Sequence, residues 1–226
     1  METFISIITV LFLSISANAM TRIGIIDTGF SGIYNTKASL KALCKEGHYD
    51  FDMKSPTVGY DEMGHGSFVA NIIAKETVHT NYCLQIYKVF GKGAINDPKV
   101  VSNAIVKAVK NGATLINLSL TMFNHSEYDK KVVRWATKRG VKIYAAAGNE
   151  STNLNKVCKS YPSCYNLNDN LIRVGALNRF GKKADYSNYG MSVAVYKFGM
   201  YDSKTLGTSF AAPRALAFHL NETEGN

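Results

Sequence analysis

Short apolar segments of strand length alternate along this 226-residue chain with longer segments of helical periodicity. Strands that alternate with helices of ten or more residues are joined by right-handed crossovers, which leave the strands parallel. The expected fold class is therefore α/β, with a mainly parallel sheet and helices on both faces. The expected strands are 22–26, 82–90, 115–118, 141–147 and 171–176, and the expected helices run from Pro98 to Gly112 and from about Ser126 to Lys138.

The size and composition of the chain fit one domain with one substantial core. Hydrophobic residues make up 46% of the chain and charged residues 19%, which is enough apolar material for a compact domain of ordinary size. No linker-like tract, charge block or internal repeat divides the sequence. We therefore expect a single domain over residues 20–226.

The first nineteen residues have the pattern of a secretory signal peptide. Phe4 to Ile15 is almost entirely apolar and leads into Ala17-Asn18-Ala19, the small-x-small pattern that precedes a cleavage site. We expect residues 1–19 to be removed and the protein to be secreted or periplasmic; a buried N-terminal strand or helix is the alternative. No later segment reaches about 18 consecutive apolar residues, so no membrane contact is expected after cleavage.

Four cysteines fall in two pairs along the chain, Cys44 with Cys83 and Cys158 with Cys164. An even number of cysteines agrees with export, although four allow three connectivities. The short segment between Cys158 and Cys164 favours a bridge there, with inert buried thiols as the alternative. No CxxC or HxxxH spacing accompanies the cysteines, so metal ligation is less favoured.

Basic residues outnumber acidic residues by 26 to 17, which gives a formal net charge of +9. Nucleic-acid binding requires such charge to cluster with stacking aromatic residues, whereas here the lysines are spread from Lys37 to Lys182. The pattern indicates a solvated basic surface and no nucleic-acid partner.

Polar residues stand at or just after the ends of three expected strands. They are Asp27, Ser119 and Asn149. Open parallel sheets bind ligands at the carboxyl ends of their strands, so we expect these residues to share one cleft.

Three segments that contain candidate catalytic residues resemble signatures of the subtilisin-like serine proteases. They are IIDTGF around Asp27, GHGSFVA around His65 and LGTSFAAP around Ser209, and they occur in that family's order of aspartate, histidine and serine. GATLINLSL and VKIYAAAGNE resemble the family's substrate-flanking strand and oxyanion segment. The resemblance extends from Arg22 to about His219 and implies a subtilisin-like three-layer sandwich with serine endopeptidase activity.

Each of these residues has a physical reason to take part in such chemistry. A serine hydroxyl is nearly inert at neutral pH, so Ser209 needs a base, and the imidazole of His65 has a suitable ordinary pKa of about 6.5. Asp27 is expected to fix the imidazole tautomer. Ser209 is expected to begin a helix, with Pro213 in its first turn, so that its N–H and the side chain of Asn149 stabilise an oxyanion.

The resemblance also implies how a polypeptide substrate binds. An extended peptide would pair with Ser119, Leu120 and Thr121 as an added strand. The side chain before the scissile bond would enter a pocket bounded by Ala146, Gly148 and Glu150. Thr121 replaces the family's usual glycine and is expected to narrow one subsite, and Glu150 is expected to favour a basic residue.

Several residues depart from the family pattern near the catalytic helices. Asn71 and Ala217 replace glycines, Leu216 replaces a small residue, and Arg214 stands where histidine is common. Only a few residues lie between the expected signal peptide and the first expected strand, so no folding propeptide is expected. These departures motivate a second hypothesis, a catalytically silent domain that binds a peptide or partner.

An unrelated nucleotide-binding protein is a third hypothesis, but no GxGxxG or GxxxxGKS loop follows the first strand. We expect a monomer without a cofactor. No DxDxDG loop is present, and calcium held by scattered carbonyls is not readable from the sequence.

Overall fold

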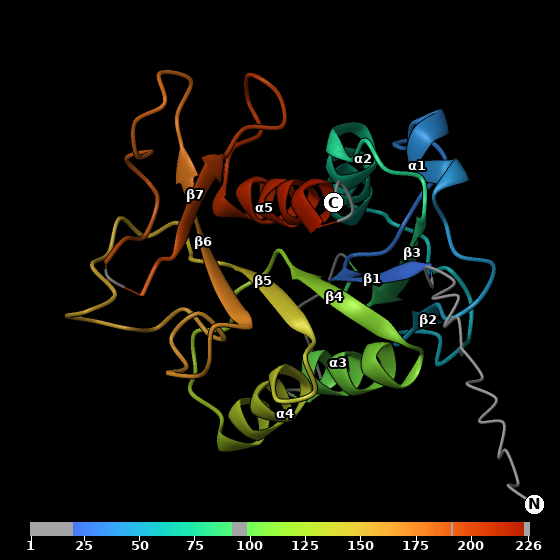
Figure 1. Cartoon of the computed structure of the whole chain (residues 1–226), viewed down its shortest axis with the longest axis horizontal. Helices are drawn as coiled ribbons and strands as arrows, with labels where there is room; N and C mark the ends of the chain where they lie inside the picture. Colours follow the sequence, from blue (N-terminus) through green and yellow to red (C-terminus); the bar gives the residue numbers. More distant parts are fainter. Residues whose placement is uncertain (1–19, 92–98, 191, 224–226) are drawn as a thin grey trace, which may run out of the picture.

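The computed structural model describes residues 20–91, 99–190 and 192–223. Its central feature is a seven-stranded sheet in the order β2-β3-β1-β4-β5-β6-β7 (Figure 1). All six pairings between these strands are parallel, which confirms the expected α/β class. The strands are β1 (Thr21–Asp27), β2 (Tyr49–Asp50), β3 (Tyr82–Lys88), β4 (Ala113–Leu118), β5 (Lys142–Ala146), β6 (Leu171–Leu177) and β7 (Val195–Phe198).

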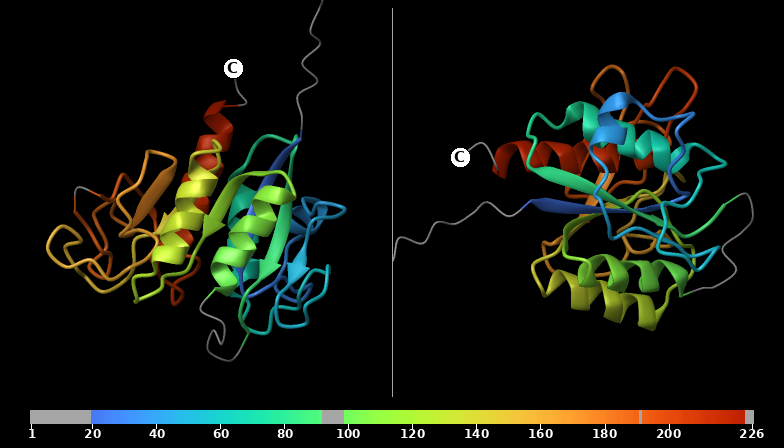
Figure 2. Two further views of the ribbon diagram at one scale, coloured as in Figure 1. Left: turned by 90° about the horizontal axis from the view of Figure 1, so that it is seen from below. Right: turned by 90° about the vertical axis from the view of Figure 1, so that its right-hand side faces the viewer.

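Helices cover both faces of the sheet, as Figures 1 and 2 show from three directions. On one face lie α1 (Lys37–Lys41), α2 (His65–Glu76) and α5 (Thr208–Thr223). On the other face lie α3 (Val100–Lys110) and α4 (Glu127–Thr137). The expected three-layer arrangement is confirmed.

Alternation of side chains along the strands fills one core on each side of the sheet. In β1, Ile23 and Ile25 pack in the core under α2 and α5, whereas Ile26 packs in the core beside α3 and α4. All three side chains are fully buried. Because both faces of a parallel sheet are covered, its strands read as continuous apolar runs.

The expected elements are present with small differences at their ends. The strand expected at 82–90 ends at Lys88, and the helix expected from Pro98 begins at Val100; Pro98 itself lies outside the described residues. The sequence does not predict β2, β7 or α1, which are only two to five residues long.

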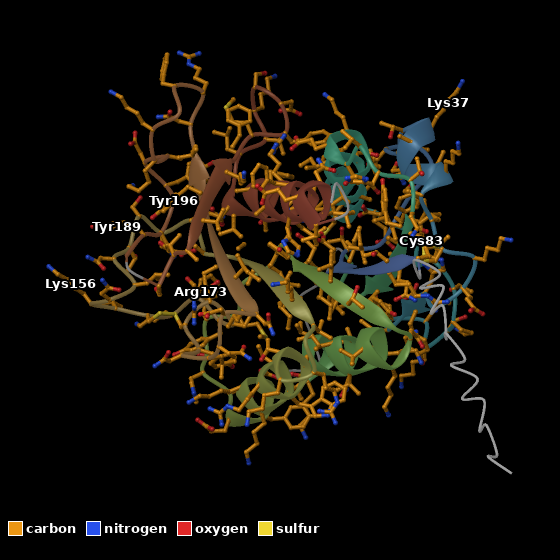
Figure 3. The ribbon with its side chains drawn as sticks, viewed as in Figure 1. Lys37, Cys83, Lys156, Arg173, Tyr189 and Tyr196 are labelled. Atoms are coloured by element: carbon orange, nitrogen blue, oxygen red, sulfur yellow. A yellow bond between two sulfur atoms is a disulfide. The ribbon has the colours of Figure 1, made fainter. Side chains whose placement is uncertain are left out.

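Both cysteine pairs form disulfides in the structure. The predicted Cys158–Cys164 bridge is confirmed, with an S–S distance of 2.02 Å. Cys44 and Cys83 form the second bridge, with an S–S distance of 2.08 Å. This bridge ties the segment after α1 to β3, where Figure 3 labels Cys83.

The residues that depart from the family pattern are accommodated between α2, α5 and their neighbours. Asn71 accepts from the hydroxyl of Ser39 at 2.7 Å and donates to the carbonyl of Tyr34 at 2.8 Å. Arg214 donates to Glu76 at 2.7 Å, which links α5 to α2. Leu216 and Ala217 are fully buried.

Basic side chains lie at both ends of the molecule. Lys37 and Lys156, labelled in Figure 3, point outward at opposite ends of the molecule.

The segment 1–19 lies outside the described residues, so the signal peptide stays a prediction. Within the described ranges no helix combines the length and apolar character needed to cross a membrane.

Candidate active site

The carboxyl ends of β1, β4 and β5 bring the candidate residues to one edge of the sheet. Asp27 is the last residue of β1, Ser119 follows β4, and Asn149 lies three residues after β5. His65 begins α2, and Ser209 is the second residue of α5. Direct contacts link these elements in pairs: β1 with α2, and both β4 and β5 with α5.

Asp27 and His65 form a short hydrogen bond. The Nδ1 atom of His65 lies 2.7 Å from Oδ1 of Asp27, which is fully buried, while 27% of the imidazole side chain is exposed. Oδ1 also accepts from the N–H of Thr28 at 2.8 Å. This contact requires the Nδ1–H tautomer and leaves Nε2 free to act as a base.

The pKa of His65 is raised above its ordinary value. Burial of the imidazole lowers this pKa, but the charge and hydrogen bond of Asp27, together with the charge of Asp61, outweigh that effect. The electrostatic surroundings therefore stabilise the imidazolium that general-base catalysis forms.

Ser209 is held by an exchange of hydrogen bonds with Ser119. The Oγ of Ser209 donates to the carbonyl of Ser119 at 2.9 Å, and the Oγ of Ser119 donates to the carbonyl of Ser209 at 2.6 Å. The expectation that Pro213 lies in the first turn was wrong, since Pro213 is the sixth residue of α5. Proline there lacks the N–H that would bond to the carbonyl of Ser209, and Ser119 satisfies that carbonyl instead.

Asn149 is oriented through its carboxamide oxygen. That oxygen accepts from the N–H of Thr208 at 2.9 Å and from its hydroxyl at 3.0 Å, which leaves the amide nitrogen as a donor. A Cβ placed on Gly207 would lie 3.6 Å from this nitrogen and 3.7 Å from the N–H nitrogen of Ser209. Both expected oxyanion donors therefore border the same small space beside Gly207.

The expected substrate-binding residues line the same edge. Ser119 and Leu120 are buried and Thr121 is half-buried, and the next residue, Met122, pairs with Tyr161 in an antiparallel bridge. The carbonyl of Ala146 accepts from the hydroxyl of Ser163 at 2.7 Å. Gly148 has a φ of 102° and little space for a side chain.

Glu150 lines a cavity of about 170 Å³ together with Phe123, Lys159, Ser160 and Asn188. Its carboxylate accepts from Asn188 at 2.6 Å and from Ser160 at 3.2 Å. Because these donors already occupy the carboxylate of Glu150 and the cationic Lys159 lines the same cavity, the cavity offers a weaker attraction for a basic side chain than the sequence alone indicates.

Sequence reasoning missed Asp61, a fully buried carboxylate that accepts from Thr28, the residue after Asp27. It accepts from the hydroxyls of Thr28 and Ser67 at 2.8 and 2.7 Å. No local capping pattern marks this role, because the N-cap residue of α2 is Gly64 and Asp61 lies three positions before it.

Comparisons with known proteins agree with the fold. The model of the subtilase family matches residues 19–218. A thermophilic serine proteinase of Bacillus sp. (strain AK1) is 30% identical over 85% of this chain, and subtilisin DY of Bacillus licheniformis is 29% identical over 86%. The alignments cover 49% and 73% of those two proteins.

Among solved structures, a lanthipeptide protease superposes with a TM-score of 0.74 at 21% sequence identity, covering 88% of this chain and 72% of the other. At this level of identity the likeness concerns the fold.

Proposed function

The chain belongs to the subtilase family, and from that premise we propose that it is a serine endopeptidase with Ser209 as nucleophile, His65 as base and Asp27 as the orienting carboxylate. The observation that carries the proposal is the 2.7 Å contact between His65 and Asp27, on the same sheet edge as Ser209 and Asn149. A buried aspartate that fixes the Nδ1–H tautomer prepares Nε2 to accept a proton.

In the proposed reaction, the Oγ of Ser209 attacks the carbonyl carbon of the scissile peptide while His65 Nε2 takes its proton. The carbonyl electron pair moves to oxygen, where the N–H of Ser209 and the amide of Asn149 donate to it. Collapse of this intermediate breaks the C–N bond, and His65 returns the proton to the leaving amine. Water then hydrolyses the acyl-enzyme by the same steps, with His65 again as base.

The hydroxyl of Ser209 must exchange acceptors for this reaction. It donates to the carbonyl of Ser119 at 2.9 Å, so substrate binding has to be accompanied by rotation of the hydroxyl toward His65. Hydrogen bonds between catalytic groups often become short only in the complex with substrate. The carbonyl of Ser119, once released, is then able to pair with the N–H of an added peptide strand.

The proposed substrate is a polypeptide that extends to both sides of Ser209. The acyl part pairs with residues 119–121, and Ala146, Gly148 and Glu150 border its main side-chain pocket. Because His65 protonates the leaving amine, the other part continues past His65 toward Phe210 and Tyr201, whose rings are 5.9 Å apart. The reaction needs no cofactor, since side chains and backbone supply nucleophile, base and oxyanion donors.

We further propose that the protein acts outside the cytoplasm, after removal of residues 1–19, as a monomer. The two disulfides support an oxidising compartment.

Labelling with a fluorophosphonate tests the proposal, with the Ser209→Ala variant as control. We expect the intact chain to be labelled and to cleave a proteome-derived peptide library, and the variant to do neither. The second candidate is a silent peptide binder, which the engagement of Ser209 with Ser119 favours. Peptide binding without labelling or cleavage by folded protein would establish that alternative and refute the protease.

A further inference from the structure

A second buried carboxylate, Asp61, lies behind the proposed catalytic pair. It receives five hydrogen bonds, from the hydroxyl of Thr28, from the N–H groups of Met63, Gly64 and Ser67, and from the hydroxyl of Ser67, at 2.7 to 3.1 Å. Buried carboxylates usually need a cation or several donors to remain ionised, and here donors surround both oxygens.

We propose that Asp61 is a positioning residue that holds His65 against Asp27 by locking together the segment after β1 and the first turn of α2. The proposal rests on the function proposed above and adds a residue that acts on the reaction through His65.

The two hydroxyls that donate to Asp61 cross-link these segments in opposite directions. Thr28, next to Asp27, accepts from the N–H of Gly66 at 2.9 Å, next to His65. Ser67, on α2, accepts from the N–H of Ser31 at 3.0 Å, in the segment after β1. A carboxylate only accepts hydrogen bonds, so it commits both hydroxyl hydrogens to itself and leaves their oxygens to accept from the opposite segment.

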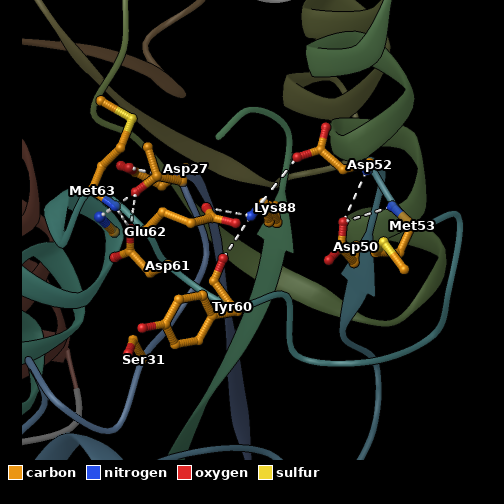
Figure 4. A network of polar contacts seen from close by, with 12 residues as sticks. Asp27, Ser31, Asp50, Asp52, Met53, Tyr60, Asp61, Glu62, Met63 and Lys88 are labelled. Carbon is orange, nitrogen blue, oxygen red and sulfur yellow. Dashed lines mark hydrogen bonds and ion pairs between the residues drawn. The ribbon is translucent and has the colours of Figure 1, made fainter. Parts of the chain in front are cut away.

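Lys88 fixes the loop that carries Asp61, as Figure 4 shows. Its side chain is only 4% exposed, and its ammonium group donates to the carbonyl of Tyr60 and to the carboxylate of Glu62, both at 2.6 Å. These residues flank Asp61 on both sides. Lys88 also pairs in register with Asp27, so one buried cation ties the loop of Asp61 to the strand end that orients His65.

Two charged groups act on the His65 imidazole, Asp27 from β1 and Asp61 from the loop before α2. From α5 the imidazole meets the uncharged ring of Phe210, at 5.4 Å between centroids. The Asp61 charge helps to raise the pKa of His65, and the donors of Ser67, Thr28 and Gly64 keep the pKa of Asp61 itself below its ordinary value despite burial.

Asp61→Asn tests the proposal without changing the size of the side chain. The N–H of Gly64 donates to one oxygen of Asp61 and the N–H of Ser67 donates to the other. Whichever oxygen the new NH₂ group replaces, it therefore faces a backbone N–H, and two donors oppose each other. We expect kcat to fall about 10- to 100-fold with KM within about twofold, and the acid limb of the kcat/KM profile to move to lower pH.

Asp129→Asn is the matched control, because Asp129 is an equally buried carboxylate in α4 that accepts from the hydroxyl of Ser102. This variant should lose stability but keep kcat and its pH profile. If Asp61→Asn behaves like this control, Asp61 is only structural and the proposal is overturned.

Thr28→Val separates the positioning role from the charge of Asp61 and serves if Asp61→Asn does not fold. It removes the bridge between Asp61 and Gly66 but keeps the carboxylate, so kcat should fall while the acid limb stays in place. Thr28→Ser keeps the hydroxyl and should restore most of kcat. Full kcat in Thr28→Val would contradict the proposal.

An NMR titration of His65 in the Ser209→Ala background gives a readout that does not need activity. The proposal expects the pKa of His65 to fall on adding Asp61→Asn, and an unchanged pKa would refute the electrostatic part. If the intact chain neither cleaves peptides nor reacts with fluorophosphonate, the proposed protease function fails, whereas this titration still decides whether Asp61 acts on His65.

Discussion

The two halves of the candidate active site are built differently. In the base half, Asp27, Asp61 and Lys88 are buried charged groups, and the Asp27–His65 contact is already formed at 2.7 Å. In the nucleophile half, Asn149 is exposed and Ser209 is half-buried, the side chains are neutral, and the hydroxyl of Ser209 bonds to a backbone carbonyl.

This difference indicates which half adjusts when substrate binds. Buried charges are costly to move, because each must keep its partners in a medium of low dielectric constant. A serine hydroxyl, in contrast, changes acceptor by rotation about one bond. We therefore expect the base half to be rigid before substrate arrives and the nucleophile half to complete its geometry in the complex.

Removal of the nucleophile is expected to have the largest effect. Ser209→Ala and His65→Ala should each lower kcat by about 10⁶-fold, and the double variant should lose little more, because both residues act in one proton-transfer unit. Steady-state kinetics with an internally quenched peptide, together with thermal melts, measure this. Losses that multiply in the double variant would show that the two halves work independently.

Loss of the side-chain oxyanion donor should rank second. Asn149→Ala should lower kcat by about 10²- to 10³-fold with little change in KM, because the contact forms fully only in the tetrahedral state. Asn149→Asp should be at least as damaging, since it removes the donor and adds a negative charge where another develops. Unchanged kcat in a folded Asn149→Ala variant would refute the oxyanion assignment.

Gly207→Ala probes the space between the two oxyanion donors. The nearest atoms to the added Cβ are at 3.6 Å or more, so the backbone should tolerate the methyl group, while the oxyanion meets it. We expect kcat to fall about 10-fold or more with an unchanged melting temperature. A loss of stability instead would mean that Gly207 has a packing role.

The pH profile reports on the base half. Because the pKa of His65 is raised and only the neutral imidazole accepts a proton, kcat/KM should fall as the pH drops through a value above the ordinary pKa of about 6.5. Below that value the loss should be about tenfold per pH unit. An acid limb at or below pH 6.5 would show that burial lowers the pKa of His65 by at least as much as the charges of Asp27 and Asp61 raise it.

The sequence was sufficient to predict five of the seven strands, the α/β class and the candidate residues Asp27, His65 and Ser209, because apolar periodicity and local motifs are properties of contiguous residues. It did not reveal Asp61 or Lys88 as partners of the site, since their roles depend on contacts across 26 to 33 positions. Nor did it show that the hydroxyl of Ser119 satisfies the carbonyl of Ser209, 90 residues away, which Pro213 leaves without its helical donor. Long-range polar networks leave no periodic signal in the sequence.

Removal of each disulfide should affect the two halves differently, and it should have the smallest effect on kcat of all the changes considered. Cys44–Cys83 spans 39 residues and is anchored at the amino end of β3, the strand that ends at Lys88 of the base half, and Cys158–Cys164 spans 6 residues beside the substrate pocket. The chain-entropy model gives a contribution to unfolding free energy of about 4 kcal/mol for the longer loop and about 2 kcal/mol for the shorter one. Paired serine substitutions should therefore lower the denaturation midpoint more for the first bridge. Since neither sulfur pair contacts Asp27, His65 or Ser209, kcat should stay within about twofold in folded samples.

KM is expected to rise only when the Cys158–Cys164 bridge is removed, because its loop contains Ser160, which lines the cavity beside Glu150. Denaturant melts and peptide kinetics on both variants measure these effects, and an equal rise of KM in the two would contradict the separation of the halves.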